Sequence, residues 1–123
     1  MAVNLPITIN IEKRTRQNEA FRAVFDTSDQ MQLVFMSLLP GEDIGFEVHP
    51  TVTQFIRIEE GTGVCVLNNN EYLLDNRSAV FIPAGTWHNI INTGPISLKL
   101  YTLYSSAMHP YNEFQMDKPN DED

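Results

Sequence analysis

Hydrophobic and polar residues alternate over short segments along most of the chain. Apolar side chains at every second position are typical of a β-strand with one buried face, because successive side chains of a strand point to opposite sides. Residues that favour turns, mainly Gly, Pro, Asn and Asp, separate these segments. The predicted strands cover residues 5–11, 21–25, 31–39, 44–49, 53–59, 63–67, 71–74, 78–82, 87–91 and 97–104. Short strands at this spacing indicate an all-β antiparallel sandwich or barrel.

The N-terminal region contains the one expected helix and one apolar strand. Residues 12–20 are rich in charge and form the only segment with helical character. Before them, Ile7, Ile9 and Ile11 fall on one side of the first predicted strand. An apolar edge strand left exposed would pair with another chain. We therefore expect a two-fold homodimer joined through this N-terminal strand.

Length and charge limit the organisation of the chain and its partners. The 123 residues fit one domain, which we place at residues 1–110. Residues 111–123 are polar and acidic without periodicity, and we expect a disordered tail. A formal net charge of −8 repels phosphate backbones and anionic lipid, so neither nucleic acid nor membrane is expected as a partner.

Targeting signals and cysteine content point to the cytoplasm. No apolar run approaches the roughly 20 residues that cross a bilayer. The first residues lack a basic stretch followed by an apolar one, so no secretory signal is visible. The single cysteine, Cys65, lies in an alternating segment and is expected to be a strand residue rather than a catalytic thiol.

Two segments carry residues suited to chemistry. Residues 41–61 read GEDIGFEVHPTVTQFIRIEEG, in which Glu47 and His49 are two apart and share one face of a strand. Gln54 lies on the next predicted strand, so a hairpin can bring the three side chains together. Residues 83–92 read PAGTWHNIIN, in which a tight turn precedes His88 at the start of a strand.

The spacing of these segments resembles the two signature motifs of the cupin superfamily. The places of the first motif, at residues 41–61, are held by Gly41, Glu47, His49, Gln54 and Gly61. Those of the second, at residues 77–92, are held by Pro83, Gly85, His88 and Asn92, with Arg77 where the motif opens on glycine. The chain is most similar to compact single-domain cupins of the mannose-6-phosphate-isomerase-like subgroup. This resemblance implies a double-stranded β-helix, or jelly-roll barrel.

The resemblance also implies one divalent metal ion per chain inside the barrel. Carried over by position, its ligands are Glu47, His49, Gln54 and His88. Glutamate replaces the first histidine of the family pattern and glutamine replaces its glutamate, so whether this altered set binds metal tightly stays open. Two imidazoles and one carboxylate form the donor set of non-heme iron sites, and the absence of thiolate argues against a structural zinc site. Zn, Fe, Mn, Ni and Co all remain possible.

Three functions are compatible with this donor set, and whether the chain is an enzyme stays open. The first is an isomerase or epimerase that uses the ion as a Lewis acid on a small polar or sugar-like substrate. The second is a non-heme-iron dioxygenase. The third is a non-catalytic module that binds or senses a small molecule in the barrel.

Four residues are candidates for a catalytic role. Glu47 is a possible base only if it does not bind the metal. Tyr101 and Tyr104 face opposite sides of the last predicted strand, so at most one of them lines the interior. His109 follows that strand in a loop and is a candidate to cover the mouth of the barrel.

Overall fold

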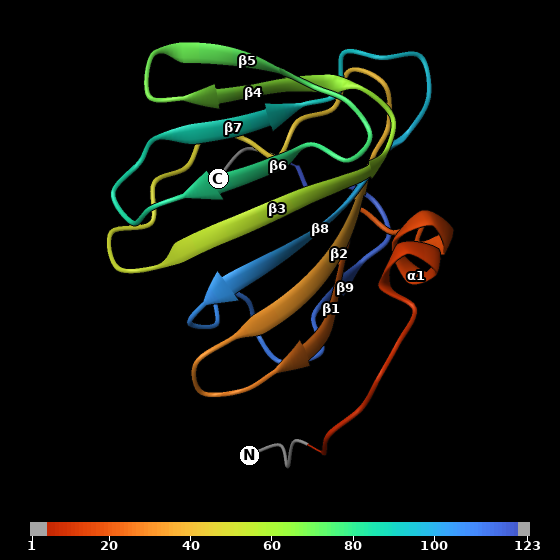
Figure 1. Ribbon diagram of the computed structural model, residues 1–123, viewed down its shortest axis with the longest axis vertical. Coiled ribbons are helices and arrows are strands. Elements are labelled where there is room, and N and C mark those ends of the chain that lie inside the picture. The colour runs from red at the N-terminus through yellow and green to blue at the C-terminus, as the bar shows by residue number, and fades with distance from the viewer. Residues whose placement is uncertain (1–4, 121–123) are drawn as a thin grey trace.

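The computed structural model describes residues 5–120, which form two antiparallel β-sheets (Figure 1). The larger sheet has the strand order β6 (Ala79–Ile82), β3 (Thr53–Glu60), β8 (Leu98–Ser105), β2 (Gln32–Leu38), β1 (Arg22–Thr27) and β9 (Phe114–Gln115). The smaller sheet has the order β5 (Asn70–Leu74), β4 (Gly63–Leu67) and β7 (His88–Ile91). Among the described residues the two sheets do not close into one continuous ring of strands. The all-β prediction is confirmed, in a jelly-roll arrangement.

The core fills the space between the sheets, and the alternating pattern explains why. On β3, Gln54, Ile56 and Ile58 are buried, whereas Phe55 and Arg57 between them are partly exposed. Inner-facing side chains of β2, β8, β4 and β7 complete a single apolar cluster. Burial of this apolar surface drives the two sheets together.

Residues 44–49, predicted as a strand, run beside β7 without forming a regular one. Two isolated bridges join residues 43–47 to β7, from Asp43 to Ile91 and from Glu47 to His88. The segment has one residue more than β7 between the bridges, which is a β-bulge, and Gly45 adopts φ 95° within it. Glu47 and His88 exchange backbone hydrogen bonds of 3.0 and 2.9 Å. The bulge therefore sets Glu47 directly opposite His88.

The predicted strand over residues 5–11 is wrong. Residues 5–10 lie outside any helix or strand, and α1 (Ile11–Gln17) begins where the strand was expected to end. The Asn10 side chain accepts a hydrogen bond of 3.0 Å from the Lys13 N–H, which caps the helix and outweighs the short apolar alternation. The homodimer remains a prediction, but a single chain does not contain the strand through which it was expected to pair.

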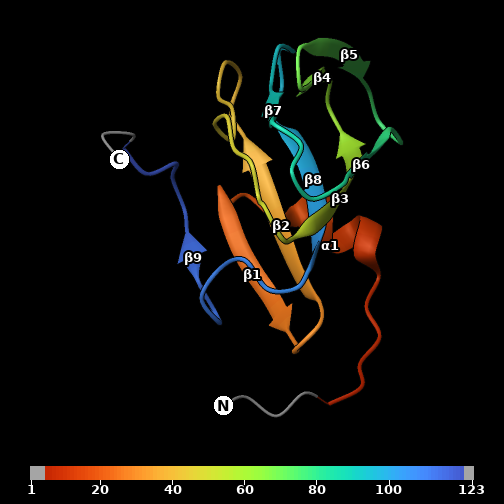
Figure 2. The same ribbon diagram turned by 90° about the vertical axis from the view of Figure 1, so that its left-hand side faces the viewer.

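Helix α1 lies on the outer face of the larger sheet, against β3 and β8 (Figure 2). Arg14 stacks over the ring of Phe25 at 4.9 Å, and Arg16 lies 3.5 Å from the Glu60 carboxylate. Within residues 5–120 no helix is long and apolar enough to cross a membrane. The helix closes one side of the sheet and leaves the opposite, inner face to the core.

The C-terminal segment was expected to be disordered, but part of it forms a strand. Strand β9 pairs with β1, and the Phe21 N–H donates to the Met116 carbonyl at 2.8 Å. Without β9, strand β1 would be an edge strand with unpaired backbone groups. β9 pairs with these groups through its own backbone, so it needs no apolar side-chain pattern. Residues 121–123 lie outside the described residues.

Gly61, at the turn between β3 and β4, lies close to the backbone of residues 97–98 and leaves no room for a side chain. Its φ is +95°, and a Cβ there would lie 2.7 Å from the Ser97 carbonyl oxygen. We expect Gly61→Ala to lower the free energy of unfolding by about 2–4 kcal/mol, from backbone strain and overlap together. Gly41→Ala is the matched control, since Gly41 has φ +87° with nothing within 4 Å. Urea unfolding measures both, and equal losses would contradict the predicted overlap.

Candidate metal centre

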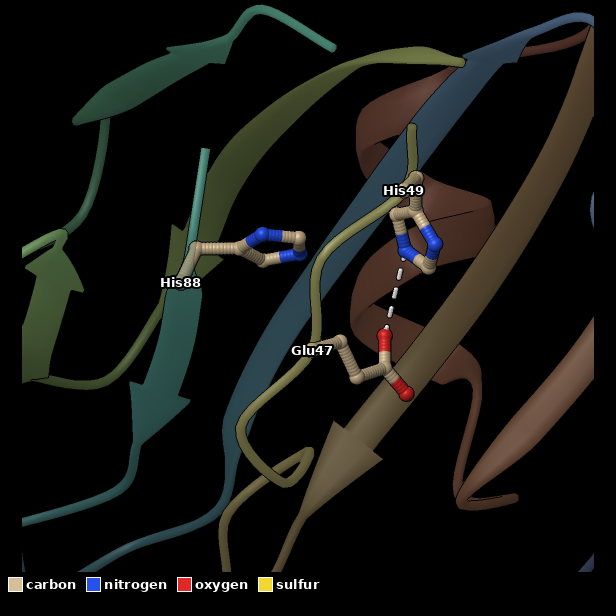
Figure 3. Close-up of side chains that lie close together, drawn as sticks. All are labelled: Glu47, His49 and His88. Atoms are coloured by element: carbon tan, nitrogen blue, oxygen red, sulfur yellow. Dashed lines mark ion pairs between the residues drawn. The ribbon is translucent and has the colours of Figure 1, made fainter. Parts of the chain in front are cut away.

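The side chains of Glu47, His49 and His88 converge between the two sheets (Figure 3). One ligand atom from each residue lies within 4.8 Å of the other two. The His49 Nε2 to Glu47 Oε1 distance is 3.2 Å, and the two imidazole centroids are 5.2 Å apart. Ligands bound at about 2.0–2.2 Å from one ion lie up to about 4.4 Å from each other. Small side-chain rotations therefore suffice for one ion to contact all three residues.

His88 is held in the form that a metal ligand needs. Its side chain is fully buried at the start of β7, and its Nδ1 lies 2.9 Å from the Thr86 carbonyl oxygen. Because a carbonyl only accepts hydrogen bonds, this contact places the imidazole proton on Nδ1. Nε2 then carries the lone pair, and it is buried without a hydrogen-bond partner. A backbone carbonyl that orients the imidazole in this way is typical of metal-binding histidines.

Two more buried atoms lack hydrogen bonds: His49 Nε2 and Gln54 Oε1. The contact between His49 and Glu47 is close enough for an ion pair but does not have hydrogen-bond geometry. Gln54 lies on the inner face of β3 and donates from Nε2 to Thr102 Oγ1 at 3.0 Å, which leaves its carbonyl oxygen unpaired. A buried polar atom without a partner costs about 1–3 kcal/mol. These atoms, together with Nε2 of His88, have the chemistry to bind a divalent ion.

Burial keeps His49 in the neutral state that can bind metal. Removal from water lowers the pKa of His49 below its usual value of 6.5, the Glu47 carboxylate opposes this shift, and His88 adds to it. A histidine must be neutral to offer its lone pair. His49 is therefore available as a ligand at neutral pH.

Of the other candidates, Tyr104 and His109 lie next to the centre and Tyr101 does not. Tyr104 is buried on the inner face of β8 and lies edge-on to His49, with ring centroids 6.3 Å apart. His109 folds back so that its Nε2 is 3.3 Å from the Tyr104 hydroxyl. Tyr101 is half-buried on the opposite face of β8. Burial lowers the pKa of His109 to about 4, so His109 is a neutral acceptor for Tyr104 at neutral pH.

Gln32 positions His109 and was not predicted from the sequence. Its side chain is fully buried on β2, where Oε1 accepts the N–H groups of Met108 and His109 at 3.0 Å each. Its Nε2 donates to the His109 carbonyl at 2.8 Å. The available signal was a polar residue in register with the apolar Val34 and Met36 on the inner face of the strand.

Comparisons with known proteins agree with this fold and site. Residues 34–104 match the family model described as Cupin domain. The Bacillus subtilis (strain 168) protein YrkC is 45% identical over 112 residues, which covers 86% of this chain, and this chain spans 60% of the length of that relative. The crystal structure of BH2720 from Bacillus halodurans is 41% identical with a TM-score of 0.90, covering 91% of this chain and 89% of that one.

A likeness to a more distant structure concerns the fold alone. A putative sugar phosphate isomerase from Acidithiobacillus ferrooxidans is 19% identical with a TM-score of 0.60. The superposition covers 63% of this chain and 51% of that one.

The low pKa of His109 predicts a loss of stability in acid. The unfolded chain binds a proton at His109 near pH 6.5, whereas the folded chain does so only near pH 4. The free energy of unfolding therefore falls as the pH drops from about 6.5 to 4. We expect metal-free wild type to lose about 1–2 kcal/mol more than His109→Gln over this range, after allowance for solvent screening. Urea unfolding at pH 7 and pH 4 measures the difference, and parallel losses would refute the assignment.

Proposed function

The chain is a member of the cupin family, and on this basis we propose that it holds one divalent metal ion between its sheets. The ligands are Glu47, His49 and His88, with the Gln54 side-chain oxygen as the fourth. The observation that carries this proposal is the convergence of three donor atoms within 4.8 Å, two of them imidazole nitrogens that are buried without a hydrogen-bond partner.

The proposed activity is an isomerase-type or epimerase-type reaction on a small polar molecule. When bound, the ion supplies Lewis acidity to a carbonyl or hydroxyl oxygen. Glu47 alone offsets ionic charge, because the imidazoles and the amide are neutral, so the ligand set favours an anionic or hydroxylated substrate. The Glu47 side chain is 38% exposed, which makes this side of the site accessible to a small molecule.

Tyr104 and His109 are the groups placed to handle a proton. Neutral His109 accepts a hydrogen bond from the Tyr104 hydroxyl at 3.3 Å, and Tyr104 packs against His49. Burial raises the pKa of Tyr104, so its hydroxyl keeps its proton at neutral pH and acts as a donor. The pair can hold a proton beside the metal without adding a charge to the site.

Oxygen chemistry at iron is the second candidate. Two histidines and one carboxylate are the donor set of non-heme iron oxygenases, and these three residues are the ones that the structure brings together. Bound iron that reacts with oxygen would favour this activity, whereas zinc or nickel would favour the Lewis-acid reaction. A small molecule that binds tightly and is recovered unchanged would instead support a non-catalytic sensing module.

Metal content tests the ligand set directly. We expect protein purified without a metal-affinity step to contain about one divalent ion per chain by elemental analysis. His88→Gln and Glu47→Gln should weaken metal binding by at least about 10-fold, because each removes a ligand of the ion. Calorimetric titration of the metal-free protein with Zn²⁺ and Mn²⁺ measures the affinity.

Two variants outside the ligand set serve as controls for that experiment. Glu59→Gln changes a carboxylate paired with Arg57 on the other face of β3, and His109→Gln changes a histidine that is not a ligand. Both should bind metal like wild type. Unchanged metal binding in correctly folded His88→Gln and Glu47→Gln, checked by circular dichroism, would reject the proposed centre.

A further inference from the structure

A cavity of about 350 Å³ opens beside the metal centre. It lies between the start of β1, the segment that carries Glu47, and residues 118–120. Its walls are formed by Phe21, Arg22, Ile44, Gly45, Phe46, Glu47, Lys118, Pro119 and Asn120. Glu47 is thus both a candidate metal ligand and part of the cavity wall, so a small molecule in the cavity would lie beside the proposed metal site.

Arg22 is the buried cation of this cavity. It lies opposite Met36 in the β1–β2 register, on the inner face of the sheet, and its side chain is 11% exposed. Nη1 donates to the Gln115 side chain at 2.7 Å and lies 3.8 Å from the Glu113 carboxylate. Nε is buried and has no hydrogen-bond partner. The guanidinium is therefore anchored at one nitrogen and unsatisfied at another.

The unsatisfied nitrogen points to a missing acceptor. An unpaired buried donor on a charged group costs more than the 1–3 kcal/mol or so of a neutral one. A guanidinium presents its N–H groups in a planar fork that matches the two oxygens of a carboxylate or phosphate. The Phe21 ring, 5.1 Å from the guanidinium carbon, fixes the plane of the fork. Arg22 is thus arranged in advance to bind a planar or tetrahedral oxyanion.

Charge balance around the cavity also favours an anion. Lys118 lines the cavity and pairs with Asp43, and Arg22 lies 3.8 Å from the Glu113 carboxylate. A divalent ion at the centre would carry two positive charges, and Glu47 is the one carboxylate among its proposed ligands. In a chain with a formal net charge of −8, this cavity would be locally positive.

We propose that Arg22 binds the carboxylate or phosphate group of a small ligand whose other end reaches the metal ion beside Glu47. The metal end of this ligand rests on the proposed function, whereas the anionic end rests on Arg22, whose attraction for the anion the proposed ion would strengthen. The cavity volume is near the lower limit for small-molecule sites, which restricts the ligand to a compact acid or phosphate ester. The buried Phe21 ring packs against the guanidinium, reduces the water around it and so strengthens its attraction for the anion.

The test compares probes that differ in charge but little in size. Glycolate and inorganic phosphate are titrated calorimetrically into the metal-loaded full chain, and ethylene glycol serves as the neutral counterpart of glycolate. We expect Arg22→Gln to weaken binding of the anions at least about 10-fold and to leave the response to ethylene glycol unchanged. Arg22→Lys should be intermediate, because it keeps the charge and loses the fork. The tighter of the two anions identifies the carboxylate or the phosphate as the recognised group.

Two control variants separate anion binding from a structural role of Arg22. Arg57→Gln removes an arginine from the other face of β3 and should bind both anions like wild type. Gln115→Ala breaks the hydrogen bond that anchors Arg22 to β9 but keeps the guanidinium, so it should weaken anion binding less than Arg22→Gln does. If Gln115→Ala loses as much affinity as Arg22→Gln, the role of Arg22 is structural and the proposal is overturned.

Repeating the phosphate titration on metal-free protein separates this proposal from the proposed function. If the wild-type chain takes up no metal when metal is supplied, and Arg22→Gln still lowers its phosphate affinity, the anion site is supported and the metal centre is rejected. Equal anion affinity in wild type and Arg22→Gln, with metal bound normally in both, would overturn the anion site and leave the metal centre standing. Elemental analysis of each variant provides the metal content for this comparison.

Discussion

The candidate site depends on the backbone pairing between residues 43–47 and β7. The two hydrogen bonds exchanged by Glu47 and His88 place these residues directly opposite each other, where side chains of an antiparallel pair are about 4.5–5.5 Å apart at Cβ. His49 follows on the same segment and completes the group. The extra residue at the bulge shifts the register by one residue. Without the bulge, a residue other than Glu47 would lie opposite His88. Gly45 permits this bulge because it adopts a positive φ at little cost.

The interior around this pairing is divided into an apolar part and a polar part. Leu38, Ile58, Leu98 and Leu100 are almost fully buried and supply the hydrophobic stabilisation. Further along the same strands, Gln32, Gln54, Thr102 and Tyr104 take inner positions and are equally buried. Such polar residues stabilise less than leucines would, and Gln54 Oε1 lacks a partner, as do the Nε2 atoms of His49 and His88. The apolar half thus stabilises the fold, while the polar half contains buried atoms without hydrogen-bond partners. Such unpaired atoms are expected at a ligand-binding site.

Elements marked by a pattern of apolar and polar side chains could be predicted from the sequence. Elements that depend on backbone hydrogen bonds, such as β9, could not. Alternation located β3, β4 and β8 nearly to the residue, and the spacing of Glu47, His49 and His88 pointed to the family that the match over residues 34–104 confirms. The three isoleucines before residue 12 alternate like a strand, but a single capping asparagine starts a helix there instead. Strand β9 is held by backbone pairing along β1, which leaves no pattern of apolar positions to detect. Arg22 could not be recognised as inward-facing, because a charged residue on a strand normally faces solvent.

The C-terminal segment brings residues from outside the matched family region next to the candidate metal ligands. The matched family region contains all the candidate metal ligands but none of Arg22, Gln115 and Lys118, which lie before and after it. Strand β9 brings Gln115 and Glu113 to Arg22, while Lys118 reaches across to Asp43 beside the bulge. The same short segment therefore positions the guanidinium and closes the cavity that Glu47 borders. In the functions proposed above, the cupin fold would supply the metal ligands, and the segments before and after the matched region would supply the cations that select the small molecule.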